Sequence, residues 1–241
     1  MGYDFCQGYF FKNQLTYIEI NQFSNDKNYS SINITILKEA PMCGRYYVDD
    51  DTAKEIERII RMAEEKVAKI TDEPLLLSSG DIHPTDTAPI LVADGQGLCC
   101  HMQKWGFPGF DKKQVIFNAR SESALEKPTF RDAMVKRRIV VPAAGFYEWN
   151  RHKEKSTFYR KNYPALFMAG LYNPYEEGER FVILTTAANP SMEPVHDRMP
   201  LLLEESELLP WMLDPDAAKE ILMKVPYLLE RKTEFEQMSL F

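Results

Sequence analysis

The sequence predicts a mixed α+β fold, with a mainly antiparallel sheet or barrel flanked by helices. Apolar residues recur at helical spacing over residues 52–69. Strand-like apolar runs, separated by polar or proline-containing loops, then dominate residues 90–186. Helical character returns between and after those runs, which is the mixed pattern of an α+β protein.

The first predicted helix covers residues 52–69. Its apolar residues stand at i, i+3, i+4, i+7 and i+11, the spacing that places side chains on one face of a helix. An aspartate before it, Asp50 or Asp51, is placed to cap the first turn. The apolar positions are Ile56, Ile59, Ile60, Ala63 and Val67.

The later elements follow from apolar runs and the breaks between them. Residues 90–93 and 98–105 predict two strands paired around the turn Asp94-Gly95. Residues 119–137 predict two short helices with a break at Lys127-Pro128-Thr129. Further strands are expected at 139–142, 145–149, 165–171 and 180–186, and a last helical region at 205–224, interrupted by Pro210 and Pro215.

Residues 1–41 differ from the rest of the chain. Asn, Tyr, Ser and Phe are frequent there, and only a short strand within residues 32–38 is expected. Lys38-Glu39-Ala40 is compatible with codons that form a ribosome-binding sequence before Met42. We therefore hypothesise that residues 1–41 are an extension that is either non-native or removed, and that residues 42–241 form one domain.

Composition narrows the class of protein. Hydrophobic residues make up 44% and charged residues 27% of the chain, which is ordinary globular usage. No apolar run reaches the roughly 18 to 20 residues of a membrane helix, and the start lacks the order of a signal peptide, so we expect a cytoplasmic protein without membrane contact. The cysteines at 6, 43, 99 and 100 and the histidines at 83, 101, 152 and 196 lack the spacing of zinc ligands, so we expect free thiols and neither metal nor other cofactor.

The charge of the chain bears on nucleic-acid binding. A net charge of −7 argues against general binding, because phosphate neutralisation needs a basic surface. Any site for DNA must therefore be local. The candidates for such a local basic patch are Arg45, Arg120, Arg131, Lys136, Arg137, Arg138 and Arg198.

Most of the chemistry is carried by four short strings: Met42-Cys43-Gly44-Arg45-Tyr46, Asn118-Ala119-Arg120-Ser121-Glu122, Gly145-Phe146-Tyr147-Glu148-Trp149 and His196-Asp197-Arg198-Met199-Pro200. Each is weak alone, since an isolated Cys is usually a small core residue. Together and in this order, with Trp105-Gly106-Phe107 and residues 185–189, they resemble the SOS-response-associated peptidase (SRAP) family over residues 42–213. The resemblance implies an α+β fold with a β-barrel-like core and a groove for single-stranded DNA that contains an abasic site.

The resemblance also implies roles for individual residues. Cys43 would become the first residue once the preceding residues are removed, and would bond covalently to the abasic site. Glu148 would act as general acid and base at the sugar, and His196 would assist the proton transfers that open its ring. Asn118 would orient the sugar or the cysteine. The residues along the DNA path, where guanidinium groups grip phosphates, would be Arg45, Arg120 and Arg198.

Two aromatic residues and a proline complete the expected DNA contacts. Trp105 and Phe107 are either core aromatics or platforms on which bases beside the lesion stack, and we expect Trp105 to be partly exposed. Pro84 lies in a loop where the resemblance implies a wedge that kinks the DNA at the lesion.

An N-terminal cysteine has a chemical use that does not depend on the family. Its α-amine can condense with the ring-opened aldehyde of an abasic deoxyribose, and its thiol can then close on the same carbon to give a thiazolidine ring. An internal cysteine has only an amide nitrogen, which is not nucleophilic. With residues 1–42 attached, Cys43 therefore keeps its thiol but lacks the required amine.

Two other functions remain open from the sequence. A cysteine peptidase would use Cys43 as nucleophile, His196 as base and Glu148 as orienting carboxylate, and could cleave its own chain before Cys43. A non-covalent module would bind single-stranded DNA reversibly through its arginines and aromatics. We expect a monomer, because a groove for one DNA strand needs no partner subunit.

Overall fold

The computed structural model divides the chain into two compact units, Met1–Pro41 and Met42–Phe241. In the first unit β1 (Ile18–Ile20) and β2 (Ile34–Ile36) pair antiparallel, and β2 confirms the strand expected within residues 32–38. The structure describes residues 18–20, 34–36, 44–65, 79–95, 97–109 and 114–234.

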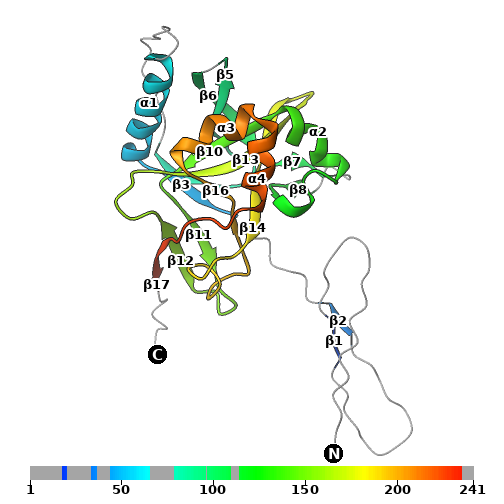
Figure 1. Ribbon diagram of the computed structural model, residues 1–241. Coiled ribbons are helices and arrows are strands. Elements are labelled where there is room, and N and C mark those ends of the chain that lie inside the picture. Colours follow the sequence, from blue (N-terminus) through cyan, green and yellow to red (C-terminus); the bar gives the residue numbers. More distant parts are fainter. Residues whose placement is uncertain are drawn as a thin grey trace, which may run out of the picture. The chain divides into compact units, whose positions relative to one another are not determined.

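A closed barrel of five strands forms the centre of the second unit (Figure 1). The strands follow the order β14-β6-β5-β10-β13, and β13 pairs back onto β14. All neighbours run antiparallel except β6 and β14, which are parallel. The predicted α+β class with a mainly antiparallel, barrel-like core is confirmed. The five strands are β5 (Thr87–Asp94), β6 (Gly97–Trp105), β10 (Arg138–Ala143), β13 (Leu166–Tyr175) and β14 (Gly178–Ala187).

A second antiparallel sheet of five strands lies beside the barrel, in the order β17-β12-β11-β3-β4. Of its strands only β11 was predicted. Strand β12, for example, contains Lys155-Ser156-Thr157, which has too few apolar residues to indicate a strand. A two-stranded pair, β7 (Phe107–Pro108) with β8 (Val115–Ile116), stands apart from both sheets. The strands of the second sheet are β3 (Tyr46–Val48), β4 (Gly80–Ile82), β11 (Gly145–Trp149), β12 (Lys155–Tyr159) and β17 (Glu230–Glu234).

The predicted hairpin around Asp94-Gly95 is confirmed as β5 and β6, which pair along their whole length up to Asp94 and Gly97. Gly95 has a φ of +62°, a conformation that glycine adopts without steric cost. The strands predicted within β10, β13 and β14 are also present.

The predicted helical segment 119–137 is only partly correct. Asn118–Arg120 forms strand β9, because its backbone pairs in parallel with β14, and a 3-10 turn η1 (Ser121–Ser123) follows. The expected break holds, since helix α2 (Pro128–Lys136) begins with Pro128 in its first turn. On the other side of β14 lies β15 (Arg198–Pro200), and β16 (Leu202–Leu203) pairs with β13.

Helix α1 (Asp50–Glu65) matches the start of the predicted helix, and residues 66–69 of that prediction lie outside the described residues. Its cap is Asp49, not Asp50 or Asp51: the Asp49 carboxylate accepts the Thr52 backbone N–H and hydroxyl, each at 2.8 Å.

The last helical region consists of η2 (Glu205–Glu207), α3 (Leu208–Leu213) and α4 (Pro215–Met223). Pro210 does not interrupt a helix, because it lies in the first turn of α3, where a backbone N–H is not needed. Pro215 does mark a break, since it begins α4. None of the helices in the described part of the chain is long and apolar enough to cross a membrane.

The barrel strands direct alternate residues to two separate apolar cores. Leu91 and Val140 face the core that the helices cover, on the side where α3 and α4 lie in Figure 1. Ile90 and Val141 belong to the other core, which also contains residues of the second sheet, among them Tyr46. This second core joins the barrel to the sheet that carries two of the four sequence strings.

Candidate functional site

Cys43 lies outside the described residues, so the site is built from the residues that follow it. Strand β3 pairs with β11, with Phe146 opposite Tyr46, and the Tyr147 N–H donates to the Arg45 carbonyl at 3.0 Å. Glu148 directly follows Tyr147 in β11 and so lies one residue beyond this hydrogen bond. The carboxylate of the third string is therefore held next to the first string by the sheet itself.

Glu148 is a buried carboxylate, with 5% of its surface exposed. Side chains alternate along β11, so that Phe146 and Glu148 face inward while Tyr147 and Trp149 are partly exposed. Placing an ionisable group on the inward face of a strand has an energetic cost unless its charge is paired or hydrogen-bonded. Buried ionisable groups of this kind are candidates for proton transfer.

Trp105 connects the first string to the second. Its indole Nε1 donates to the Phe117 carbonyl at 2.9 Å, and the centroids of the two rings lie 5.8 Å apart. Its other edge meets Tyr46, with centroids 5.1 Å apart. Arg45 directly precedes Tyr46 in the sequence, and Asn118 directly follows Phe117. Trp105 thus fixes β3 and the start of β9 relative to one another.

The fourth string meets the second at the end of β14, which lies between β9 and β15. The Arg198 guanidinium donates to both carboxylate oxygens of Glu122, at 2.5 and 2.8 Å, and to the Thr185 carbonyl at 2.7 Å. On the other side of Thr185, Arg120 is its register partner. The structure therefore brings Arg120 and Arg198 to the same strand end.

Electrostatics keep the ion pair between Glu122 and Arg198 formed. Burial by itself raises the pKa of the Glu122 carboxyl, but the hydrogen bonds and charge of Arg198 outweigh burial and hold that pKa below its usual value. Glu122 is consequently ionised at neutral pH. Arg198, whose side chain is 14% exposed, is held in one orientation.

The loop that carries His196 is tied to the C-terminal part of the chain. Asn189 is buried, and its side-chain nitrogen donates to the carbonyls of Pro226 at 3.0 Å and Tyr227 at 2.9 Å. Its oxygen accepts the Ser191 N–H at 3.0 Å. The loop is therefore a fixed support for His196.

The His196 ring has a partner in either protonation state. Its Nδ1 lies 3.1 Å from the Arg198 backbone N–H, which it can accept when unprotonated. The same Nδ1 lies 2.9 Å from a carboxylate oxygen of Asp197, to which it can donate when protonated. A group that exchanges protons without moving needs such an arrangement.

A family model described as SOS response associated peptidase (SRAP) matches residues 42–239. The chain belongs to the SRAP family.

Relatives with names and solved structures agree with this membership. The chain is 29% identical over 217 residues to "Abasic site processing protein YoqW" of Bacillus subtilis, covering 83% of this chain and 93% of YoqW. It is 30% identical over 187 residues to "Abasic site processing protein YedK" of Escherichia coli, covering 74% of this chain and 83% of YedK. A solved structure of a Bacteroides thetaiotaomicron protein superposes with a TM-score of 0.64 at 22% identity, covering 79% of this chain and 91% of that chain, which shows a shared fold.

In this SRAP protein the expected exposure of Trp105 is wrong. Trp105 and Phe107 are both 0% exposed, so neither presents a ring face on which a base could stack. Phe107 instead packs against Phe130 and Tyr175, with ring centroids 6.2 and 5.6 Å away. Both aromatics are core residues.

The aromatic residue that sequence reasoning missed is Trp149. It is partly exposed at the end of β11, and the Arg45 guanidinium lies 5.4 Å from its ring centroid. Arg45 also faces Asp81, with nitrogen and oxygen 3.8 Å apart. The sequence could have indicated this exposure. Trp149 directly follows Glu148, and successive residues of a strand point to opposite faces, so an inward Glu148 turns Trp149 outward.

The basic run Lys136-Arg137-Arg138 does not form the expected patch. Lys136 and Arg137 both pair with Asp132, at 3.0 and 2.5 Å. Arg138 is buried, and its guanidinium donates to backbone carbonyls at the ends of two helices. Those acceptors are Met134, Val135, Trp211 and Met212, at 2.8, 3.0, 2.5 and 3.0 Å.

Pro84 lies in the half-exposed turn between β4 and β5. The next residue, Thr85, has a φ of +84° and donates its N–H to the Trp105 carbonyl at 2.8 Å, so the turn is attached to the end of β6. This residue is a strained non-glycine position, as often occurs near ligand sites. The wedge role of Pro84 stays a prediction.

Neither Cys100 nor the described acidic and histidine residues point to a second centre. Burial raises the pKa of the Cys100 thiol to about 12, which keeps it protonated and a poor nucleophile. Among the residues that the structure describes, no three His, Cys, Asp or Glu side chains gather as a metal site.

Proposed function

We propose that this chain processes abasic sites in single-stranded DNA by forming a covalent bond through Cys43. Membership of the SRAP family and the names of YoqW and YedK support an abasic site as the lesion that this chain processes. The observation that carries the proposal is the buried carboxylate of Glu148, one residue beyond the hydrogen bond between the Tyr147 N–H and the Arg45 carbonyl. We propose that this carboxylate transfers protons for the amine and thiol of Cys43.

The proposed reaction balances with no added reagent. The Cys43 amine attacks the aldehyde carbon of the ring-opened sugar, and the C–O bond breaks as one water molecule leaves, giving an imine. The thiol sulfur then bonds to the imine carbon, and its proton goes to the nitrogen. The product is a thiazolidine, and the total change is the loss of one water.

The site residues take separate parts in this reaction. Glu148 accepts a proton from the amine and returns one to the departing oxygen, and His196 assists ring opening. Asn118, at the start of β9 beside the Trp105 contact, orients the sugar. Arg45, Arg120 and Arg198 hold the phosphates on either side of the lesion. Trp149, being partly exposed, takes the stacking role first expected of Trp105.

The reactive form of the protein begins at Cys43. Both the family match and the division into compact units begin at Met42, which supports a functional unit of residues 42–241 with residues 1–41 as a removable extension. Removing the residues before Cys43 creates the amine that the thiazolidine needs. We also propose that this unit acts as a monomer on one DNA strand.

The test is to mix the chain that begins at Cys43 with single-stranded DNA containing one abasic site, and to score adducts on a denaturing gel. Cys43→Ala is expected to form none. Glu148→Gln is expected to slow adduct formation by about 10²- to 10⁴-fold, the usual size of a general acid–base effect. Glu126→Gln, at an exposed position, is the matched control and should react like the parent. A Cys43→Ala adduct of equal yield would refute the proposal.

A peptidase activity is the second candidate, and the name of the family favours it. In that mechanism Cys43, activated by His196, would cleave the chain before itself and expose its own amine. Mass analysis of the full chain after incubation separates the two. Loss of residues 1–42 from the parent but not from His196→Ala would support self-cleavage.

A further inference from the structure

The outer face of the second sheet carries an unusual set of residues. On β3, β11 and β12 the inward positions are buried, whereas the outward positions Tyr47, Tyr147 and Tyr159 are partly exposed. Aromatic residues presented on an open sheet face commonly form a contact surface, because they offer large rigid area with a polar end.

A shallow, open hollow of about 360 Å³ lies on this face. We name it the tyrosine hollow. It is lined by Tyr47, Tyr147, Lys155, Thr157, Tyr159 and Lys232.

Stacking already occurs within the tyrosine hollow. The rings of Tyr47 and Tyr147 lie 5.2 Å apart between centroids and 23° from parallel. The Lys155 ammonium lies 4.1 Å from the centroid of the Tyr147 ring. The Tyr147 ring is therefore already in contact with Tyr47 and Lys155. A base entering the hollow would stack on Tyr47 or Tyr159, with a lysine beside it to meet the phosphate that links two bases.

Lysines in the hollow can meet phosphates, and acidic residues lie nearby, since Glu230 on β17 is the register partner of Tyr159. Two of its six lining residues are lysines, brought from different strands, with Lys232 on β17 opposite Thr157 on β12. The nearby carboxylate of Asp81 accepts the Tyr147 hydroxyl at 3.0 Å and faces Arg45, which compensates part of its charge. Burial, followed by this hydrogen bond, raises the pKa of Tyr147 to about 12, so its phenol adds no negative charge.

The hollow reaches Arg45 and Trp149 at the end of β11, on the face of that strand opposite to Glu148. Trp149 is the register partner of Lys155, and Arg45 lies over Trp149. Residues paired across an antiparallel ladder have Cβ atoms about 4.5–5.5 Å apart, so the step from Trp149 to Lys155 is shorter than one side chain. A strand gripped by Arg45 and Trp149 thus has a direct path onto the tyrosines.

We propose that the tyrosine hollow binds nucleotides three or more positions from the abasic site, extending the DNA track across the outer face of the second sheet. This inference rests on the proposed function, since the strand must first be held at Arg45 and Trp149. Its bases stack on the tyrosines and its phosphates meet Lys155 and Lys232.

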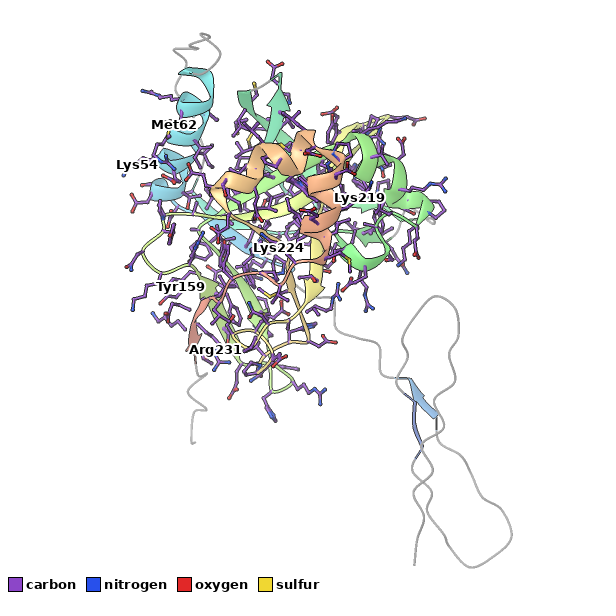
Figure 2. All side chains as sticks on the ribbon, viewed as in Figure 1. Lys54, Met62, Tyr159, Lys219, Lys224 and Arg231 are labelled. Carbon is purple, nitrogen blue, oxygen red and sulfur yellow. The ribbon has the colours of Figure 1, made fainter. Side chains whose placement is uncertain are left out.

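The experiment measures binding of the full chain to single-stranded DNA with a stable tetrahydrofuran abasic analogue, which has no aldehyde and cannot crosslink. Two lengths are compared, about 5 and about 15 nucleotides centred on the analogue, within the range of site sizes for single-strand grooves. The variant is Lys155→Ala with Lys232→Ala. The matched control is Lys54→Ala with Lys219→Ala, two exposed lysines on α1 and α4 that Figure 2 places away from Tyr159.

The hollow variant should bind the long DNA at least about fivefold more weakly, as expected for the loss of roughly 1 kcal/mol. Its salt dependence should flatten by about 1.4 in slope, for two phosphate contacts at about 0.7 each. Its binding of the short DNA, and both affinities of the control, should match the parent. Equal weakening with both lengths, or no weakening, would overturn the inference.

A second variant keeps the test valid if the double substitution unfolds the chain. Lys232 is exposed on edge strand β17, so Lys232→Glu should fold and should weaken only the long DNA. Failure of the proposed function gives a different result, namely no covalent adduct between the Cys43 chain and abasic DNA. The inference fails alone if adducts form but these lysine variants bind long DNA like the parent.

Discussion

Two tryptophans near the site should respond to substitution in opposite ways. Trp105 is fully buried and holds β3 to the start of β9, so Trp105→Ala should cost about 3–5 kcal/mol of unfolding free energy. For a domain of about 200 residues each kcal/mol shifts Tm by about 2–4 °C, which gives a fall of about 6–20 °C. Trp149→Ala should change Tm little, because the side chain is partly exposed at a strand end.

DNA binding should reverse the order of the two variants. If Trp149 stacks on a base, its loss should cost about 1–3 kcal/mol, or about 5- to 150-fold in Kd. Thermal unfolding followed by circular dichroism measures the first effect. Fluorescence anisotropy with single-stranded DNA, at a temperature where both variants are folded, measures the second. The reasoning is refuted if Trp105→Ala keeps the parent Tm and loses DNA binding, or if Trp149→Ala binds DNA like the parent.

Two further substitutions test the assignment of the arginines. Arg138→Ala should lower the unfolding free energy by at least about 1–3 kcal/mol, because buried helix-end carbonyls lose their donor. The matched substitution Lys136→Ala, at an exposed residue, should leave Tm unchanged. Neither variant should alter DNA affinity, and a weaker affinity of Arg138→Ala at the parent Tm would contradict the structural role. Glu122→Gln should strengthen binding of undamaged single-stranded DNA and steepen its salt dependence by about 0.7, since Arg198 loses its carboxylate partner. Because the pKa of Glu122 is lowered in the folded state, the ion pair stabilises the fold above about pH 4.3, and this stabilisation is lost as pH falls through the lowered pKa. Glu122→Gln and the parent should therefore be compared at neutral pH. An unchanged salt dependence of DNA binding would contradict the prediction.

The periodic elements were the most predictable part of the fold. The spacing of apolar residues was enough for helix α1 and for the hairpin of β5 and β6, because each is defined by local pattern. Strand β9 was predicted as helix, since its pairing with β14 is a contact between residues far apart in sequence. Strand β12 was missed for a related reason, because polar Ser156 stands on its buried face and its burial comes from neighbouring strands.

The candidate site was less predictable than its strings suggested. Sequence indicates which residue types stand together, and the register of β3 with β11 explains why the first and third strings belong to one site. It does not indicate which of two tryptophans faces solvent: Trp105 ends a strand that closes the barrel, and Trp149 ends a strand of an open sheet. Nor does it indicate that Arg138 caps two helices, because its acceptors on α3 are more than seventy residues away.

The most direct test of the account is the intact mass of the product formed with abasic single-stranded DNA, compared for the full chain and the chain that begins at Cys43. The account predicts an adduct only for the Cys43 chain, with a mass equal to protein plus DNA less one water. An adduct of the same kind from the full chain, with residues 1–42 still attached, would contradict the required amine. A folded Cys43 chain that forms no adduct would contradict the covalent mechanism itself.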